Sequence, residues 1–477
     1  MYTLTAEQIA RVVCGTVVVG QPNACATRVS IDSRNIDNTT LFAALDGARS
    51  DGHDYIEQAL EAGARIILID RAKATYAQNF QELVDEKAAC VVAVKSVFKA
   101  LQGLASHQRD LLDLHGRVTV IGVTGSTGKT STKEFIASIL SQEKEVVATN
   151  GNQNNELGAP LTILRVTEQT EVLVVEMGMR GKGQVRELAR IARPHIGVIS
   201  TLGSSHIELL GSREEIAHAK AELFEELPQA GCALYRFEEN FREVLQEAAN
   251  CEQISVGFDK DADIILDEVV CDDQGRYSAR ITGPFGSFNF SLPVPGEHHL
   301  VNASFGIVIG ARLGIDPQVL VRACSHATLT GMRFAHQSDA QSGLTFINDA
   351  YNANPTSMEG ACRTFSHVAC KGKRIAVLGD MLELGDYSKQ AHRAIGSLCA
   401  RLSLDVLICY GDYAADMAQA AQGEKMECVY QFELGKMDEL CQKLHELATP
   451  QDLILLKASR GCALEKIIEK MGAYSAC

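Results

Sequence analysis

The run VTGSTGKTST, Val123 to Thr132, constrains the fold most strongly, because it joins a β-like segment to a helical one. The segment VTVIGV before it is apolar enough for a buried strand, and STKEFIASIL after it has helical periodicity. Gly125 and Gly128 allow backbone N–H groups to approach phosphate oxygens, and the start of the following helix favours an anion. The run therefore predicts a phosphate-binding loop between a strand and a helix.

Two side chains in this loop indicate a nucleotide with magnesium. Lys129 is placed to neutralise β- and γ-phosphate oxygens, and Thr130 carries the hydroxyl that such a loop offers to the metal. Val123 stands where the pattern G-x-x-x-x-G-K-[ST] has its first glycine. A phosphate loop by itself leaves a transporter ATPase, a kinase, a GTPase switch and a ligase open. The predicted ATP-binding residues of the loop are Gly125, Ser126, Thr127, Gly128, Lys129, Thr130 and Ser131.

Strand-then-turn patterns recur along the chain and predict an α/β fold of three domains. With 477 residues, 46% of them hydrophobic, the chain can fill several cores. Residues 1–112 read as a small α/β domain, and residues 113–330 as a central parallel-sheet ATPase domain with an antiparallel patch near 255–295. Residues 331–477, with KRIAVLGDM, DVLICYG and DLILLKASRG, predict a Rossmann-like C-terminal domain.

Charge and cysteine usage exclude several classes of protein. The net charge of −15 argues against broad contact with nucleic acid or anionic lipid. The fifteen cysteines are scattered without a C-x-x-C pair, which is typical of a reducing compartment. The first residues lack a basic leader, and no apolar run approaches the roughly 20 residues needed to span a bilayer. We therefore expect a cytoplasmic protein that is not inserted in a membrane.

A carboxylate and a lysine stand out for their positions in this pattern. Glu176 ends the apolar run VLVVE, so at the carboxyl edge of the sheet it could reach a magnesium ion contacted by Thr130. Ser212 begins a helix that places Lys220 on the same face as its apolar residues. An ammonium that faces a core is costly unless it is paired, neutralised or modified. We therefore expect Lys220 to be paired with an anion, uncharged or covalently modified.

Seven segments in order resemble the Mur ligases: TGSTGKT, TNGNQNNELGAP, VVEMGM, GSSHIELLGSREEIAHAKAELF, PGEHHLVNA, NDAYNANP and LGDMLELG. The resemblance covers nearly the whole chain. It implies an ATP-dependent amide ligase of peptidoglycan precursor synthesis, and hence of cell wall biogenesis, cell shape and cell division. NDAYNANP and DGHDY favour the member that adds D-alanyl-D-alanine to UDP-N-acetylmuramoyl-tripeptide through an acyl phosphate, which gives the pentapeptide, ADP and phosphate.

The same resemblance implies a catalytic group of Lys129, Glu176, His206 and Lys220. Two magnesium sites would use Thr130, Glu176 and His206, together with a carbamate that carbon dioxide forms on Lys220. Asn302 would contact adenine, Asp349 would contact ribose, and Arg333 would reach ATP when the C-terminal domain closes.

The family pattern also implies how the substrates are held. Ser33 and Arg34 would bind the UDP end, since a guanidinium matches phosphate oxygens well. The other implied substrate-binding residues are Asn152, Asn154, Asn155, Tyr351, Asn352, Asn354, Lys457, Ser459 and Arg460. The chain departs from the pattern at His299, where asparagine is commoner, and at ALYRFEEN, residues 233–240, to which no role is assigned.

Three other functions remain open on the sequence. A sister ligase that adds the third peptide residue usually carries a D-N-P-R motif, which is absent here. A folylpolyglutamate synthetase-like enzyme would share the phosphate loop. A P-loop switch that uses nucleotide only for conformation would leave His206, Lys220 and NDAYNANP unexplained. We expect a monomer that binds no nucleic acid.

Overall fold

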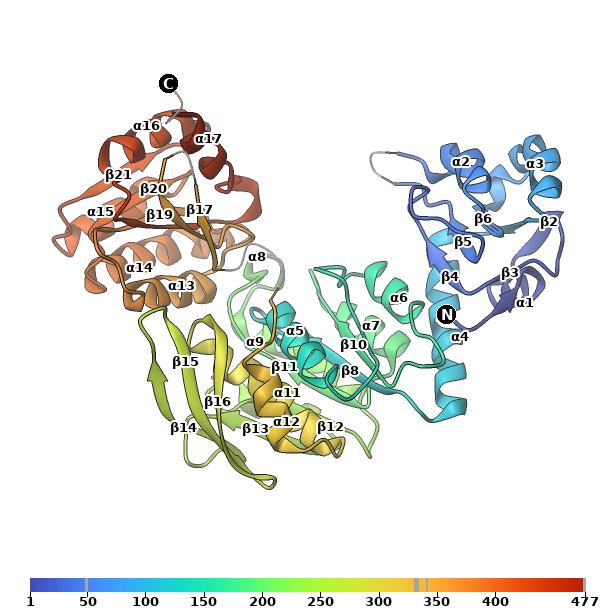
Figure 1. Cartoon of the computed structure of the whole chain (residues 1–477), viewed down its shortest axis with the longest axis horizontal. Coiled ribbons are helices and arrows are strands. Elements are labelled where there is room, and N and C mark those ends of the chain that lie inside the picture. The colour runs from blue at the N-terminus through green and yellow to red at the C-terminus, as the bar shows by residue number, and fades with distance from the viewer. Residues whose placement is uncertain (48–49, 330–333, 340–341, 475–477) are drawn as a thin grey trace.

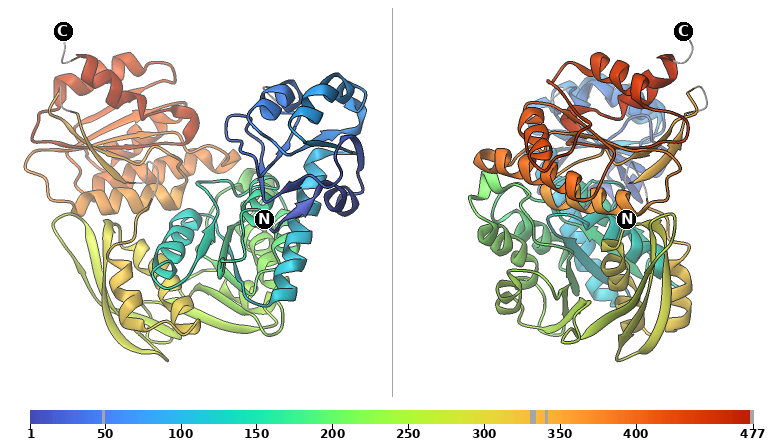
Figure 2. Two further views of the ribbon diagram at one scale, coloured as in Figure 1. Left: turned by 45° about the vertical axis from the view of Figure 1, so that its right-hand side comes forward. Right: turned by 90° about the vertical axis from the view of Figure 1, so that its left-hand side faces the viewer.

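The computed structural model describes residues 1–47, 50–329, 334–339 and 342–474. It has three α/β domains, each built on its own parallel or mixed sheet (Figure 1). The N-terminal and C-terminal domains lie above opposite ends of the central domain (Figures 1 and 2). The predicted fold class is confirmed. Within the described ranges, no helix is both long enough and apolar enough to cross a bilayer.

The central domain contains a nine-stranded sheet in the order β16-β15-β14-β13-β12-β11-β8-β10-β9. Its strands are parallel from β9 to β14, and the last three pair antiparallel, as the patch near 255–295 predicted. The strands are β8 (Thr119–Thr124), β9 (Val146–Ala148), β10 (Val172–Glu176), β11 (Ile196–Ile199), β12 (Cys232–Arg236), β13 (Glu252–Gly257), β14 (Ile264–Cys271), β15 (Arg276–Gly283) and β16 (Gly286–Pro295).

Helices cover both faces of this sheet because its central strands are apolar on both sides. In β8, Val120 points to one hydrophobic cluster, and Ile121 and Val123 point to the other. One face packs against α5 (Lys129–Leu140), α11 (His298–Arg312) and α12 (Pro317–Cys324). The opposite face packs against α6 (Gly158–Ile163), α7 (Gln184–Ala192), α9 (Arg213–Glu225) and α10 (Arg242–Ala248).

The N-terminal domain has a five-stranded sheet in the order β2-β7-β6-β5-β4, with β1 (Leu4–Thr5) and β3 (Cys25–Ala26) paired beside it. A capping box formed by Thr5 and Gln8 begins its first helix. Its other elements are β2 (Thr16–Gly20), β4 (Arg28–Ser30), β5 (Thr40–Ala43), β6 (Ile66–Asp70), β7 (Cys90–Val94), α1 (Ala6–Val12), η1 (Gly52–Tyr55), α2 (Ile56–Glu61), η2 (Arg71–Lys73), η3 (Tyr76–Phe80) and α3 (Gln81–Glu86).

The C-terminal domain has a six-stranded sheet in the order β17-β18-β22-β19-β20-β21, antiparallel only at β17. Its strands are β17 (Ala335–Ser338), β18 (Thr345–Asn348), β19 (Arg374–Gly379), β20 (Val406–Tyr410), β21 (Val429–Phe432) and β22 (Leu453–Lys457). Its helices are α13 (Pro355–His367), η4 (Gly385–Tyr387), α14 (Ser388–Arg401), α15 (Ala414–Gly423), α16 (Met437–Leu447), η5 (Arg460–Cys462) and α17 (Lys466–Tyr474).

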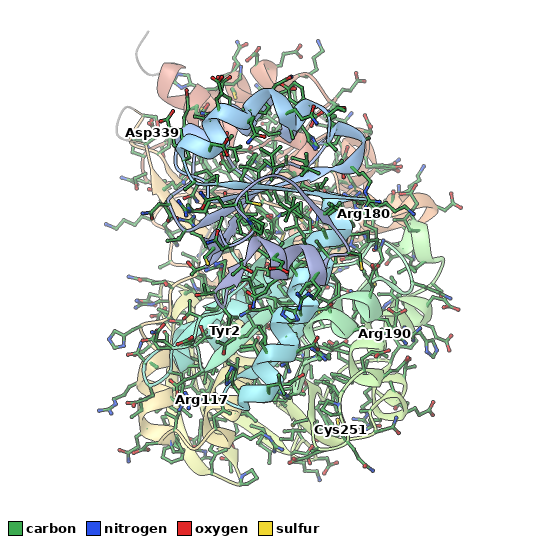
Figure 3. The ribbon with its side chains drawn as sticks, turned by 90° about the vertical axis from the view of Figure 1, so that its right-hand side faces the viewer. Tyr2, Arg117, Arg180, Arg190, Cys251 and Asp339 are labelled. Atoms are coloured by element: carbon green, nitrogen blue, oxygen red, sulfur yellow. The ribbon has the colours of Figure 1, made fainter. Side chains whose placement is uncertain are left out.

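Helix α4 (Val97–His115) joins the N-terminal domain to the central one. Tyr2 donates its backbone N–H to Gln108 of this helix at 3.1 Å (Figure 3). The buried Arg109 reaches the central domain, where its Nε donates to the Ala192 carbonyl at 2.7 Å and its Nη2 to the Arg193 carbonyl at 3.0 Å. These carbonyls end α7, so Arg109 satisfies acceptors that the helix leaves open.

Arg109→Met is expected to lower the free energy of unfolding by about 3 kcal/mol, because it leaves these buried carbonyls without donors. Urea denaturation followed by circular dichroism measures the change. Arg190→Met is the matched control. Arg190 is 66% exposed and bonds Glu226 at the surface, so its loss should change stability by less than about 1 kcal/mol. Equal effects of the two substitutions would contradict the role given to Arg109.

Candidate functional site

The phosphate loop follows β8 and is held in shape by hydroxyl groups at the end of β11. The Ser126 N–H donates to the Thr201 carbonyl at 2.8 Å, and the Thr127 N–H donates to Thr201 Oγ1 at 3.1 Å. Ser200 Oγ donates to the Thr127 carbonyl at 2.5 Å. Gly125 has φ +149°, and a Cβ built there would lie 2.1 Å from Ser200 Oγ. Glycine is therefore required at Gly125 both by its backbone and by its neighbour.

Helix α5 begins directly at the loop and presents an uncapped end to it. Gly128 occupies the N-cap position with φ +79°, and no side chain caps the helix there. The backbone N–H groups of the first turn therefore suit an anionic ligand. Lys129 Nζ donates to the Gly125 carbonyl at 2.8 Å and to the Ser126 carbonyl at 3.3 Å, so its charge lies over the loop.

Glu176, at the end of β10, faces Thr130 as the sequence predicted. The Thr130 hydroxyl donates to Glu176 Oε1 at 3.0 Å, and Asn154 Nδ2 donates to the same oxygen at 2.7 Å. Glu176 is fully buried, and its Oε2 has no hydrogen-bond partner among the described residues. A buried carboxylate oxygen without a donor is costly in the absence of a cation.

Lys220 lies on the inward face of α9 together with Ile216 and Leu223, and Leu227 just beyond the helix is also buried, which confirms the periodicity argument. The Lys220 side chain is about 1% exposed and interacts electrostatically with Lys129 and Glu222. Burial lowers the pKa of the Lys220 ammonium well below its usual value, and the charge of Lys129 acts in the same direction. Burial therefore favours the uncharged amine over the ammonium at this position.

His206 precedes the short helix α8 (Ile207–Leu210) in a left-handed backbone conformation, with φ +64°. Burial lowers the pKa of its imidazole, and the charges of Lys129 and Lys220 add to the lowering, whereas Glu383 opposes it. His206 is therefore neutral at neutral pH, which is the form that ligates metals.

These residues fit a hydrated magnesium ion better than a transition metal. Thr130 and Glu176 offer oxygen ligands, and the unpartnered Glu176 oxygen is the observation that favours a cation. No group of three or more His, Cys, Asp or Glu side chains suited to a metal is found in the part of the chain that the structure describes. A second cation would therefore depend on His206 and on a change in the charge of Lys220.

A cavity of about 970 Å³ joins these groups to the C-terminal domain. Besides residues 126–131, its lining includes the predicted residues Asn152, Asn154, Asn155, Glu176, His206, Lys220, Asn302, Asp349, Tyr351, Asn352, Asn354, Lys457, Ser459 and Arg460. Asn302 lies beside the phosphate loop, because a Cβ built at Gly128 would be 3.2 Å from its Oδ1. The buried Lys457 donates to Asp349 at 2.6 Å and to the Asn352 carbonyl at 3.2 Å.

Two predicted residues of the N-terminal domain are not brought into this cavity. Ser33 donates to Gln58 Oε1 at 2.9 Å within the N-terminal domain. Arg34 is 82% exposed there and pairs with Asp32 at 2.8 Å. Arg333 lies outside the described residues. The described lining contains no residue of the N-terminal domain, so Ser33 and Arg34 belong to a separate surface.

Several residues that shape the site were not singled out from the sequence. Ser200 and Thr201 follow β11, and hydroxyls at the carboxyl end of a central strand were the signal that could have identified them. In the unassigned segment 233–240, Glu239 accepts the Leu202 N–H at 3.0 Å. Burial raises the pKa of Glu239 to about 7. This segment therefore supports the loop that leads to His206.

Family models match three parts of the chain: the Mur ligase family, catalytic domain, over residues 26–109, the Mur ligase middle domain over residues 123–310, and the Mur ligase, glutamate ligase domain, over residues 332–460. The UDP-N-acetylmuramoyl-tripeptide–D-alanyl-D-alanine ligase of Bacillus subtilis (strain 168) is 38% identical over 474 residues, which are 99% of each chain. This chain belongs to the Mur ligase family.

Solved structures of Mur ligases resemble this one over their whole length. MurF from Acinetobacter baumannii has 28% sequence identity and a TM-score of 0.84, with 99% of each chain covered. MurF ligase from Thermotoga maritima, in complex with ADP, has 26% identity and a TM-score of 0.74 over 94% of this chain and 98% of that chain.

Gly125→Ala is expected to weaken binding of a non-hydrolysable ATP analogue by about 10- to 100-fold, because backbone strain of about 1–3 kcal/mol would distort the loop. Titration calorimetry with magnesium measures the affinity. Gly116→Ala is the control, since Gly116 also has positive φ but no neighbour within 4 Å of an added Cβ. Unchanged affinity in Gly125→Ala would show that the crowding at Ser200 is unimportant.

Proposed function

We propose that this Mur ligase joins D-alanyl-D-alanine to UDP-N-acetylmuramoyl-tripeptide with ATP, forming UDP-N-acetylmuramoyl-pentapeptide, ADP and phosphate. The observation that carries the proposal is the cavity in which the phosphate loop of the central domain faces polar groups of the C-terminal domain. Full-length similarity to a D-alanyl-D-alanine ligase supports the choice of substrates. The reaction is a step of peptidoglycan precursor synthesis.

The central domain would bind and orient the triphosphate. Backbone N–H groups at the start of α5 and the charge of Lys129 would hold the β- and γ-phosphates. Magnesium held by Thr130 and Glu176 would neutralise charge on the transferred phosphoryl group. Asn302 on α11 would contact the adenine, and Asp349 the ribose.

The chemistry requires positioning rather than a protein nucleophile. The carboxylate that ends the tripeptide attacks the γ-phosphorus, the bond to ADP breaks, and an acyl phosphate forms. The amine of D-alanyl-D-alanine, after loss of a proton, attacks the acyl carbon, and the tetrahedral intermediate expels phosphate as the amide forms. Most of the rate enhancement would come from holding three reactants together and from stabilising phosphoryl charge.

Lys220 would act as a carbamate in this scheme. Its neutral amine attacks carbon dioxide, an N–C bond forms and one proton is released, so an uncharged buried group becomes a buried anion. The burial of Lys220 and the lowered pKa of its ammonium support this modification. The carbamate, together with His206, would then complete a site for a second magnesium ion.

The remaining groups would bind the ends of the substrates. Ser33 and Arg34 would hold the UDP end on the N-terminal domain, and Asn152, Asn154 and Asn155 would face the peptide. Tyr351, Asn352, Asn354, Lys457, Ser459 and Arg460 would line the acceptor side. Closure of the C-terminal domain would bring Arg333 to ATP. We propose a monomer that acts in the cytoplasm, where ATP is available.

Lys129→Ala is expected to reduce amide formation by about 100-fold or more, because it removes the charge that lies over the phosphate loop. Coupled phosphate release, with UDP-N-acetylmuramoyl-tripeptide and D-alanyl-D-alanine, measures the rate. Lys144→Ala is the control, because Lys144 lies beyond the C-terminal end of α5 and bonds Glu171.

The same assay separates the rival functions. A sister ligase would release phosphate with UDP-N-acetylmuramoyl-dipeptide and a single amino acid instead, and a folylpolyglutamate synthetase with a folate and glutamate. Phosphate release that is independent of every peptide substrate would instead indicate a nucleotide switch. Either result would overturn the proposed reaction.

Carbamylation of Lys220 is expected to give a carbamate carbon signal in ¹³C NMR when the protein is equilibrated with ¹³C-bicarbonate. The lowered pKa of the ammonium favours the reactive amine, and acidification should remove the signal by protonating that amine. Lys220→Arg should lack the signal, and Lys144→Ala should retain it. A wild-type protein without the signal would refute carbamylation while leaving the ligase reaction testable.

A further inference from the structure

One contact across the domain boundary joins His206 to a residue with no assigned role. His206 Nδ1 of the central domain lies 2.7 Å from Glu383 Oε2 of the C-terminal domain. The two atoms are close enough for a hydrogen bond, although the ring N–H is not aligned with that oxygen. Both residues line the cavity that contains the phosphate loop. The contact is therefore part of the site and not a remote surface pair.

Both partners adopt a backbone conformation that is unfavourable for their residue types. His206 has φ +64° and Glu383 has φ +62°, in the left-handed region that favours glycine. Such conformations persist where the surrounding structure enforces them, and they cluster at functional sites. Two of them in direct contact, from two domains, indicate that the pairing has a function.

The C-terminal domain holds the Glu383 loop in place without help from His206. The Met381 N–H donates to His392 Nε2 at 2.9 Å, and the Leu382 N–H donates to Ser459 Oγ at 2.9 Å. The Asp380 carboxylate accepts two further backbone N–H groups, from residues 412 and 413. Glu383 is thus presented by a fixed loop, and this loop is the LGDMLELG segment, which no function above has used.

The loop that carries His206 is tied in turn to the phosphate loop. The Gly203 N–H donates to Ser126 Oγ at 2.8 Å, and Ser205 Oγ donates to the Ser126 carbonyl at 3.3 Å. Asn354 of the C-terminal domain donates to Ser205 Oγ at 2.7 Å. A change in the position of the C-terminal domain would therefore change the position of the loop that carries His206.

We propose that Glu383 is a positioning residue that sets the ring orientation and tautomer of His206 when the C-terminal domain docks. A carboxylate beside Nδ1 favours the proton on that nitrogen and leaves Nε2 as the nitrogen that can bind a cation. The inference rests on the role given to His206 in the proposed function. On this inference, the C-terminal domain closes over the phosphate site and also orients one of its side chains.

The first test is made on metal-free, nucleotide-free protein with ¹⁵N-labelled histidine. The ring resonances of His206 are assigned by their loss in His206→Gln. Wild-type protein should show the Nδ1–H tautomer, Glu383→Ala should shift toward Nε2–H, and Glu383→Gln, whose amide oxygen can still accept, should resemble wild type. Glu208→Gln is the control, because Glu208 lies on α8 and packs against Gly385 without contacting His206. Identical His206 resonances in all variants would overturn the proposal.

The second test is the magnesium dependence of ligation. Glu383→Ala should raise the half-saturating magnesium concentration or lower kcat by about 10- to 100-fold, as loss of a carboxylate behind a metal-binding histidine does. KM for UDP-N-acetylmuramoyl-tripeptide should change little. A Glu383→Ala enzyme with the magnesium dependence of Glu208→Gln would refute the inference alone, whereas a wild-type protein that forms no amide would refute the proposed function.

Discussion

Two buried ionisable groups, Glu176 and Lys220, are satisfied only in part by protein groups, and the site is organised around them. Glu176 has donors on one oxygen and none on the other among the described residues, and Lys220 is buried beside the charge of Lys129. Removing an ion from water costs several kcal/mol if nothing compensates. Burying both groups next to a phosphate loop costs less when a cation binds beside Glu176 and when Lys220 carries no positive charge.

The central sheet creates this arrangement because parallel strands bring their carboxyl ends to one edge. The phosphate loop follows β8, and Glu176 ends the neighbouring strand β10. Ser200 and Thr201 follow β11 on the other side, and their hydroxyls hydrogen-bond to the loop. Helix α9 then places Lys220 under the same edge. The shape of the loop thus depends on a neighbouring strand as well as on its own glycines, since Gly125 is packed against Ser200. Rigid support of this kind suits a reaction whose rate depends on positioning.

The sequence predicted those parts of the site that depend on local pattern. The phosphate loop, the strand that ends at Glu176 and the inward face of Lys220 could each be predicted within a single segment, from glycine spacing, apolar runs or helical periodicity. The partners that join segments could not. Ser200 lies more than 70 residues from Thr127, and the contact between His206 and Glu383 spans two domains. The ion pair between Asp349 and Lys457 likewise depends on the pairing of β18 with β22, which no local pattern reports.

The distribution of groups over the domains separates recognition from chemistry. The described lining of the cavity comes from the central and C-terminal domains, whereas Ser33 and Arg34 lie on the N-terminal domain and bond within it. A substrate bound at its nucleotide end by that domain would reach the phosphate loop only if the substrate were long enough to span the distance between them. The length of the substrate could therefore distinguish one precursor from another, independently of the contacts at the reacting carboxylate.

The C-terminal domain acts at the other end of the substrate. Because Asn354 contacts Ser205, and Ser205 contacts the phosphate loop, docking of that domain and the geometry of bound triphosphate are coupled through two hydrogen bonds. Such coupling would delay phosphoryl transfer until the acceptor side is in place, which protects the acyl phosphate from water.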